Sequence, residues 1–320
     1  MPIYRFGHIV KNRREALGLT QEDLADGICS VPTLSRIENG ERIPSKENYE
    51  MLLQRLGYSD TILYEFVDEK TLAQHELKFE IRQALSHEDR EKARLLLEEY
   101  AGNSDPNSAV DKQFIEIVRT LSSSSDIGLE EKITLLENAL KLTCPRYRSG
   151  KLPKILSYEE IIILNNIANC YMNLGEYDKA SAIFFHLKRY YENKMVNREE
   201  ILRTQPMILY NLSKCLGLAG KYTECIEICD TGIKIARETG RCVCLATTLY
   251  NRAWSLNKRG LLGDHEQAKE SVKEALCMAV AMQDTMLIEH FSNFIRNNYP
   301  KMIHWVTFFS GASHSGRTSV

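Results

Sequence analysis

The chain of 320 residues lacks several features that would place it in common protein classes. It has no apolar run of about 18 residues, so we expect no membrane span. Its first residues contain no apolar segment of the signal-peptide kind, and we therefore expect a cytoplasmic protein. The nine cysteines include no C-x-x-C pair, which favours reduced thiols over a disulfide framework. The eight histidines are dispersed and no phosphate-loop, nucleophile-elbow or H-E-x-x-H motif appears, so we expect neither an enzyme nor a bound cofactor or metal.

A strong excess of basic residues, the usual electrostatic sign of nucleic-acid binding, is also missing. The whole chain has 41 Lys and Arg against 43 Asp and Glu, and residues 1–67 have 8 against 10. Any nucleic-acid interface must therefore depend on where a few cations are placed, and we expect weak non-specific affinity and a reliance on dimerisation.

Residues 20–40 read as two short helices joined by a tight turn. Thr20 is suited to cap the first helix and Ser30 the second, which has Pro32 in its first turn. Gly27 allows the turn between them, and Asn39-Gly40 ends the second helix with a pair suited to left-handed backbone. This pattern predicts a helix-turn-helix.

The second of these helices buries Leu34 and Ile37 and presents small residues and one arginine outward. Such a face fits a DNA major groove, where Arg36 could bond a guanine bidentately and Val31 could touch a thymine methyl. Arg13 is also expected near this helix. The candidate DNA-binding residues are Gln21, Ser30, Val31, Pro32, Thr33, Ser35, Arg36, Arg42 and Lys46.

The segments G-L-T-Q-E-D-L-A, S-R-I-E-N-G and I-P-S together resemble the phage-repressor class of helix-turn-helix. The turn is one residue shorter, as in the PlcR-like and Rgg-like (RRNPP) peptide-sensing regulators. The resemblance covers about the first 65 residues. It implies that Arg14 of the first helix pairs with Glu38, so that both are structural rather than base-reading.

The chain divides into predicted segments of different character. Residues 1–67 form a five-helix DNA-binding domain, whose other helices are expected at 5–17, 45–56 and 60–66. Residues 68–88 form a linker and first repeat helix, residues 89–300 a repeat domain, and residues 301–320 a partly disordered extension with an apolar piece at 303–309. Further helices are expected at 72–85, 89–100, 110–121, 129–142 and 281–299, and irregular segments at 102–108 and 144–157.

A repeat begins at Asn166 and returns at Asn211 and Asn251, at spacings of 45 and 40 residues. Small residues at Ala168, Ser213 and Ala253 let helices approach closely, and a glycine follows nine residues after each Asn. The units resemble the tetratricopeptide pattern, with longer helices than usual. The register predicts a superhelical array of helical hairpins whose first helices line a concave groove.

The predicted groove face is rich in Asn, whose amide can both donate to and accept from a peptide bond. The candidate peptide-binding residues are Asn165, Asn166, Asn169, Asn173, Asn211, Lys214, Asn251 and Trp254. In the regulators named above, Asn residues on these inner helices hold a short signalling peptide, and Asn211 matches best. Alternatively, the Asn residues bond neighbouring helices and keep the array in register. Trp254 is either a platform in the groove or part of the core.

Cys225 and Cys229 lie one helical turn apart, a spacing that could supply two metal ligands. No second Cys or His pair lies nearby in sequence. We therefore interpret both thiols as packing residues.

These features together predict an all-α transcription regulator of the quorum-sensing type. It would bind palindromic double-stranded DNA as a homodimer, with a short signalling peptide in the repeat groove controlling its activity. Two alternatives remain: a repressor whose repeats only oligomerise, or an adaptor whose repeats dock another protein.

Overall fold

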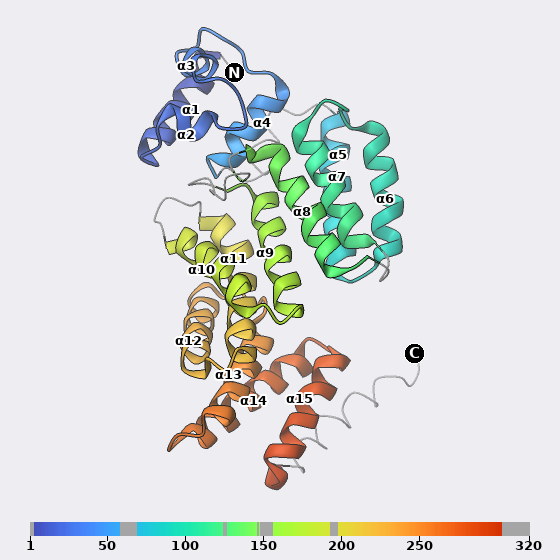
Figure 1. Ribbon diagram of the computed structural model, residues 1–320, viewed down its shortest axis with the longest axis vertical. Coiled ribbons are helices and arrows are strands. Elements are labelled where there is room, and N and C mark those ends of the chain that lie inside the picture. The colour runs from blue at the N-terminus through green and yellow to red at the C-terminus, as the bar shows by residue number, and fades with distance from the viewer. Residues whose placement is uncertain are drawn as a thin grey trace. The chain divides into compact units, whose positions relative to one another are not determined.

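The computed structural model describes residues 3–57, 69–123, 127–145, 147, 156–192 and 198–302, and all regular structure in these ranges is helical. The chain forms two compact units, residues 1–201 and 202–320, with the boundary in the first turn of α11. Figure 1 shows the order of the helices. The predicted all-α class is confirmed. None of the described helices is long and apolar enough to cross a lipid bilayer.

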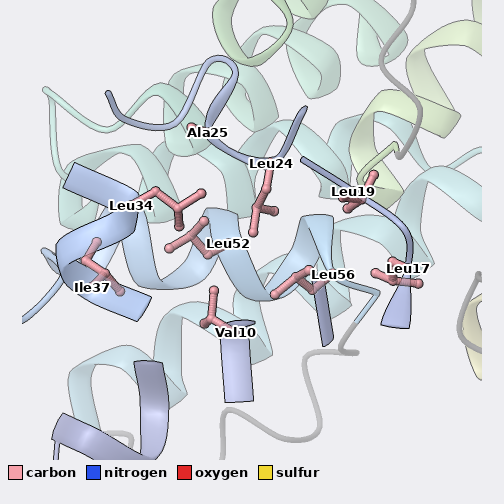
Figure 2. Close-up of a cluster of buried hydrophobic side chains, with 9 residues drawn as sticks. All are labelled: Val10, Leu17, Leu19, Leu24, Ala25, Leu34, Ile37, Leu52 and Leu56. Atoms are coloured by element: carbon pink, nitrogen blue, oxygen red, sulfur yellow. The ribbon is translucent and has the colours of Figure 1, made fainter. Parts of the chain in front are cut away.

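The first unit begins with four short helices, α1 (Ile3–Ala16), α2 (Gln21–Ala25), α3 (Val31–Glu38) and α4 (Lys46–Arg55). They enclose one apolar core, shown in Figure 2, which is formed by Val10, Leu17, Leu19, Leu24, Ala25, Leu34, Ile37, Leu52 and Leu56. The predicted inward positions of α3 are therefore confirmed. The predicted fifth helix at 60–66 and the predicted domain boundary at 67–68 lie outside the described residues.

The remaining helices of this unit stack in chain order, each packing on the next. They are α5 (Glu69–Ser86), α6 (Arg90–Asn103), α7 (Ala109–Ser122), α8 (Leu129–Thr143), α9 (Tyr158–Asn173) and α10 (Tyr177–Glu192). Two boundaries differ from the prediction. Helix α5 begins three residues earlier, and α6 continues through the start of the expected loop at 102–108.

The second unit contains most of α11 (Arg198–Leu218), then α12 (Tyr222–Thr239), α13 (Leu245–Arg259), α14 (Asp264–Ala281), α15 (Thr285–Asn298) and the short turn η3 (Pro300–Met302). The predicted capping helix at 281–299 started too early, because Ala281 ends α14. Gln283 has φ +56°, and the Asp284 carboxylate accepts a hydrogen bond from the Leu287 amide at 3.0 Å, so a new helix begins there. The predicted extension beyond residue 302 lies outside the described residues.

The repeat positions behave as their spacing predicts. Ala168, Ser213 and Ala253 are each fully buried. The glycines that follow α9, α11 and α13 all have positive φ, between +66° and +79°. A left-handed residue ends each of these helices and turns the chain into the next one.

A buried ion pair fixes α3 to α1. Arg14 donates from Nε to Glu38 at 2.6 Å and from Nη2 at 3.0 Å, while its Nη1 bonds the Leu19 carbonyl at 2.8 Å. The hydrogen bond to Glu38 raises the pKa of Arg14 above its ordinary value. The pairing implied by the family resemblance is confirmed.

We predict that Glu38→Ala destabilises the four-helix core by about 3–5 kcal/mol, because it leaves a buried guanidinium without its carboxylate. Hydrogen exchange of the α1–α4 amides would measure this loss. Glu15→Ala is a matched control, since the exposed Glu15 carboxylate lies 3.6 Å from the same guanidinium. We expect that variant to cost at most about 1 kcal/mol. Equal losses in the two variants would contradict the assignment.

Candidate nucleic-acid interface and ligand-binding face

The helix-turn-helix is positioned by capping at both of its helices. Thr20 and Asp23 form a capping box at α2, with both hydrogen bonds at 3.1 Å. Gly27 makes the turn with φ +75°, and the Ser30 hydroxyl accepts from the Thr33 amide at 3.3 Å to begin α3. Of the pair predicted to end α3 in left-handed backbone, only Gly40 adopts it, at φ +73°.

The outward face of α3 is accessible. Pro32 and Arg36 are exposed, and Thr33 and Ser35 are half-buried. Val31 is half-buried as well and packs against the core, so only part of its side chain is available. Among the described residues Arg36 has neither an ion pair nor a side-chain hydrogen bond, which leaves its guanidinium available to a ligand.

Other predicted DNA-binding residues are held by protein groups. Thr33 accepts a hydrogen bond from Arg42 at 3.4 Å, which places Arg42 beside α3. The Gln21 amide donates to Glu38 at 2.8 Å and so joins the buried ion pair beneath the face. Arg13 donates to the Leu56 carbonyl at 3.2 Å, which gives it a structural bond within the domain. Lys46 opens α4, and its side chain lies outside the described atoms.

In the first unit, four candidate Asn residues lie along α9 in different environments. Asn165 is buried and Asn173 is exposed. The Asn166 amide donates to the Ile162 carbonyl of its own helix at 2.8 Å. The side-chain oxygen of Asn169 is buried without a hydrogen-bond partner among the described residues.

In the second unit, the candidates lie on α11 and α13. Asn211 is buried, whereas Lys214 is exposed. Asn251 donates to the Ser213 hydroxyl at 3.0 Å, a bond between the two helices that fits the alternative of an Asn holding the array in register.

Trp254 is half-buried on α13, so it is both part of the packing between helices and partly open to a ligand. Its ring meets Tyr222 edge-on at 5.8 Å between centroids, and the Lys258 ammonium lies 5.7 Å from its centroid. The ring is only partly buried, and it lies next to Gly217 of α11. The α11–α13 face thus offers an aromatic surface and two exposed lysines, Lys214 and Lys258.

Cys225 and Cys229 are both buried in α12. The Ser255 hydroxyl donates to the Cys225 sulfur at 3.0 Å, and the hydrogen bond to Cys225, together with burial, raises the pKa of Cys229. These contacts agree with thiols that pack between helices.

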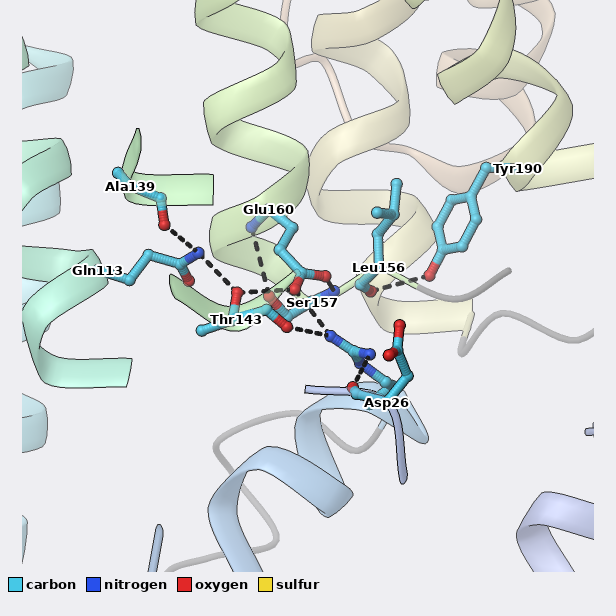
Figure 3. A network of polar contacts seen from close by, with 9 residues as sticks. Asp26, Gln113, Ala139, Thr143, Leu156, Ser157, Glu160 and Tyr190 are labelled. Carbon is cyan, nitrogen blue, oxygen red and sulfur yellow. Dashed lines mark hydrogen bonds and ion pairs between the residues drawn. The ribbon is translucent and has the colours of Figure 1, made fainter. Parts of the chain in front are cut away.

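The sequence did not predict a polar network that the structure shows at the start of α9 (Figure 3). Arg55, the last residue of α4, donates to Glu160 at 2.8 Å, to the Asp26 carbonyl at 2.8 Å and to the Thr143 carbonyl at 3.1 Å. The only local signal was the pattern of Ser157 three residues before Glu160, which forms a capping box. Nothing in that pattern indicates an arginine 105 residues away.

The fold and these surfaces define a helix-turn-helix domain followed by tetratricopeptide-like helical repeats. A sequence model described as helix-turn-helix matches residues 10–63, and the RNPP family C-terminal domain matches residues 124–296. The chain therefore belongs to the RNPP family, as the resemblance indicated.

Solved structures of similar architecture cover almost the full length of both chains. PlcR of Bacillus thuringiensis in complex with the peptide PapR7 and DNA is 20% identical, with a TM-score of 0.60 over 90% of this chain and 99% of that one. Its apo form has a TM-score of 0.58 at 18% identity over 91% and 98%. Apo ComR of Streptococcus vestibularis has a TM-score of 0.55 at 18% identity over 93% and 99%. No curated protein matches the sequence. At these identities the likeness establishes the shared fold.

The two Asn environments lead to opposite stability predictions. We expect Asn169→Leu to stabilise the protein by about 1 kcal/mol, because it removes a buried acceptor without a partner. We expect Asn251→Leu to destabilise it by about 1 kcal/mol, because it breaks the bond to Ser213. Thermal unfolding of the two variants beside the wild type would test this. A loss of stability in Asn169→Leu would show that its oxygen is needed by the fold.

Proposed function

We propose that this protein is a transcription regulator rather than an enzyme, that it binds palindromic double-stranded DNA as a homodimer, and that a short peptide bound to its repeats controls it. The accessible face of α3, with Arg36 outermost above a core fixed by Arg14 and Glu38, is the observation that carries the DNA-binding part. Membership of the RNPP family and the peptide and DNA in the PlcR complex support the whole proposal.

DNA recognition would follow from the placement of α3. Its short side chains allow the helix to enter a major groove, where Arg36 can bond guanine O6 and N7. In a two-fold dimer, two such helices read half-sites about one helical turn, roughly 34 Å, apart. The cytoplasm is the compartment in which such a regulator would work.

Peptide recognition would use the polar faces of the repeat helices. On α11 and α13, Asn211 can clamp a peptide bond, Lys214 can meet a carboxylate and Trp254 can hold an apolar side chain. The α9 residues, of which Asn169 has the unused acceptor, remain predicted ligands. A peptide that binds one arrangement of the dimer more tightly would shift the population toward it and change DNA affinity.

The DNA-binding proposal predicts that Arg36→Ala weakens sequence selection. The purified protein would select from a random pool of DNA duplexes at a stated low salt concentration. We expect a two-fold-symmetric motif from the wild type, and a loss of about 1–3 kcal/mol, roughly tenfold to a hundredfold in affinity, in the variant. Arg119→Ala removes an exposed arginine of α7 and serves as the control. Equal selection by all three proteins would contradict the role of Arg36.

The peptide proposal predicts that Asn211→Ala abolishes the peptide response while helical content is unchanged. A peptide selected from a display library of short random peptides would be titrated calorimetrically into the wild type, Asn211→Ala and the control Asn138→Ala, which changes an exposed residue of α8. An unchanged affinity in Asn211→Ala would overturn the clamp. A folded protein captured by the repeats, with no peptide that alters DNA affinity, would favour the adaptor alternative.

A further inference from the structure

Two adjacent carboxylates open helix α9, and both are buried. Glu159 is 4% exposed and Glu160 is fully buried. Carboxylates in the first turn of a helix are stabilised by the unpaired amides and the positive end of the helix dipole. That position lowers the cost of burying negative charge, but each carboxylate still requires a cationic partner.

The cationic partner of Glu160 comes from the helix-turn-helix domain. The guanidinium of Arg55, only 3% exposed, binds Glu160, while Thr143 donates its hydroxyl to the same carboxylate oxygen at 2.8 Å. The other oxygen accepts from the Ser157 amide at 2.8 Å. Gln113 in turn donates to the Thr143 hydroxyl at 2.7 Å. Figure 3 shows that this network joins α4 to the ends of α8 and α9.

The partner of Glu159 is Arg82 of α5, the helix that follows the DNA-binding domain. The Arg82 guanidinium also lies 4.9 Å from the ring centroid of Tyr158 and 5.6 Å from that of Phe114. One turn of α9 therefore binds both α4 and α5 through neighbouring carboxylates.

The turn of the helix-turn-helix packs closely against the residues that end α8. A Cβ atom at Gly27 would lie 2.4 Å from the Thr143 carbonyl oxygen and 2.8 Å from Cδ of Pro145. This close approach requires glycine, independently of its φ of +75°. The outward face of α3 stays accessible in this arrangement, because Pro32 and Arg36 are exposed. The contact therefore orients the domain and does not block its DNA-binding face.

We propose that the first turn of α9 acts as an orienting joint, which holds the DNA-binding domain at a fixed angle on the repeats. The orienting joint is defined by Arg55, Arg82, Glu159 and Glu160. In a dimer, a fixed angle restricts the two α3 helices to one spacing of DNA half-sites. The DNA-spacing consequence rests on the proposed function, whereas the joint itself does not. Because α9 also carries the four candidate Asn residues, a ligand that shifts α9 would act on α3 through this joint.

Cys144 offers a direct readout of the joint. Its thiol is fully buried, and burial, together with the nearby Glu160 carboxylate, raises its pKa to about 11, whereas Arg55 of the DNA-binding domain acts to lower it. Release of the domain from the end of α8 would expose this thiol. Cys170, in the last turn of α9, is also buried, and the charge that acts on its thiol is that of Lys132 in α8, so it reports unfolding of the repeats instead.

The first experiment measures alkylation of these thiols in full-length Glu160→Gln by mass spectrometry. Glutamine keeps an acceptor for the Ser157 cap but leaves Arg55 buried without a counter-charge. Because loss of the Glu160 charge by itself favours the Cys144 thiolate, the rates are compared per thiolate, from a series of pH values. On that scale we expect Cys144 to react at least about tenfold faster than in the wild type and Cys170 to be unchanged. Glu274→Gln, which removes the exposed partner of Arg237, is the matched control and should change neither rate. Unchanged Cys144, or Cys144 and Cys170 accelerated together, would overturn the proposal.

The second experiment measures binding to duplexes that carry the selected motif with its half-sites at the native spacing or separated by a further five base pairs, about half a turn. We expect the insertion to weaken wild-type binding at least about tenfold and Glu160→Gln binding less than about threefold, because a domain released from its joint no longer keeps one fixed angle on the repeats. A single half-site should bind both proteins equally. A variant with reactive Cys144 that keeps the wild-type spacing preference would overturn the joint's orienting role. If the wild type selects no DNA, the proposed function fails, and the thiol experiment still decides whether the joint exists.

Discussion

The ion pair between Arg55 and Glu160 is the contact on which the arrangement of the first unit depends. Burying both charges costs several kcal/mol per ion in desolvation, which a pair alone need not offset. Here the guanidinium also donates to two carbonyl groups, and the carboxylate also accepts from the Thr143 hydroxyl and the Ser157 amide. With its polar atoms so fully used, the network is specific for one docked position. A displacement of the DNA-binding domain that broke the pair would leave a buried charge without its partner, so the network favours one docked position.

A second buried ion pair, between Arg14 and Glu38, fixes the position of a helix inside the DNA-binding domain. It ties α3 to α1, whereas Arg55 ties α4 to the repeats, and the shared apolar core of α1–α4 connects the two pairs. The exposed Arg36 is therefore supported by a continuous series of buried contacts that begins at α9. This series gives a physical route for coupling that does not pass through residues 58–68. Coupling of this kind requires a ligand that binds the docked and the released arrangement with different affinity.

Local features of the fold were predictable because their causes lie within a few residues. Thr20 and Ser30 cap helices through amides three residues away, and the glycines that end the repeat helices follow from the demand for positive φ. The repeat register was visible because small buried residues recur. Arg14 and Glu38 were paired only through the family resemblance. The Arg55–Glu160 pair was not predictable, since no pattern links charges 105 residues apart and an arginine in the last turn of a helix ordinarily indicates only a favourable interaction with the helix dipole.

The Asn residues of the repeats show that one residue type can have different roles in helices of the same kind. An Asn in a helix can bond its own backbone, a neighbouring helix or a ligand, and the sequence is the same in each case. Asn166 does the first and Asn251 the second, whereas Asn169 keeps an acceptor that neither use satisfies. An unsatisfied buried acceptor costs about 1–3 kcal/mol, so a group that donated a hydrogen bond to the Asn169 oxygen would recover free energy of that order. Asn169 and Glu160 belong to the same helix, α9. A partner that bound Asn169 more tightly in one position of α9 would therefore favour that position, and with it one arrangement of the DNA-binding domain.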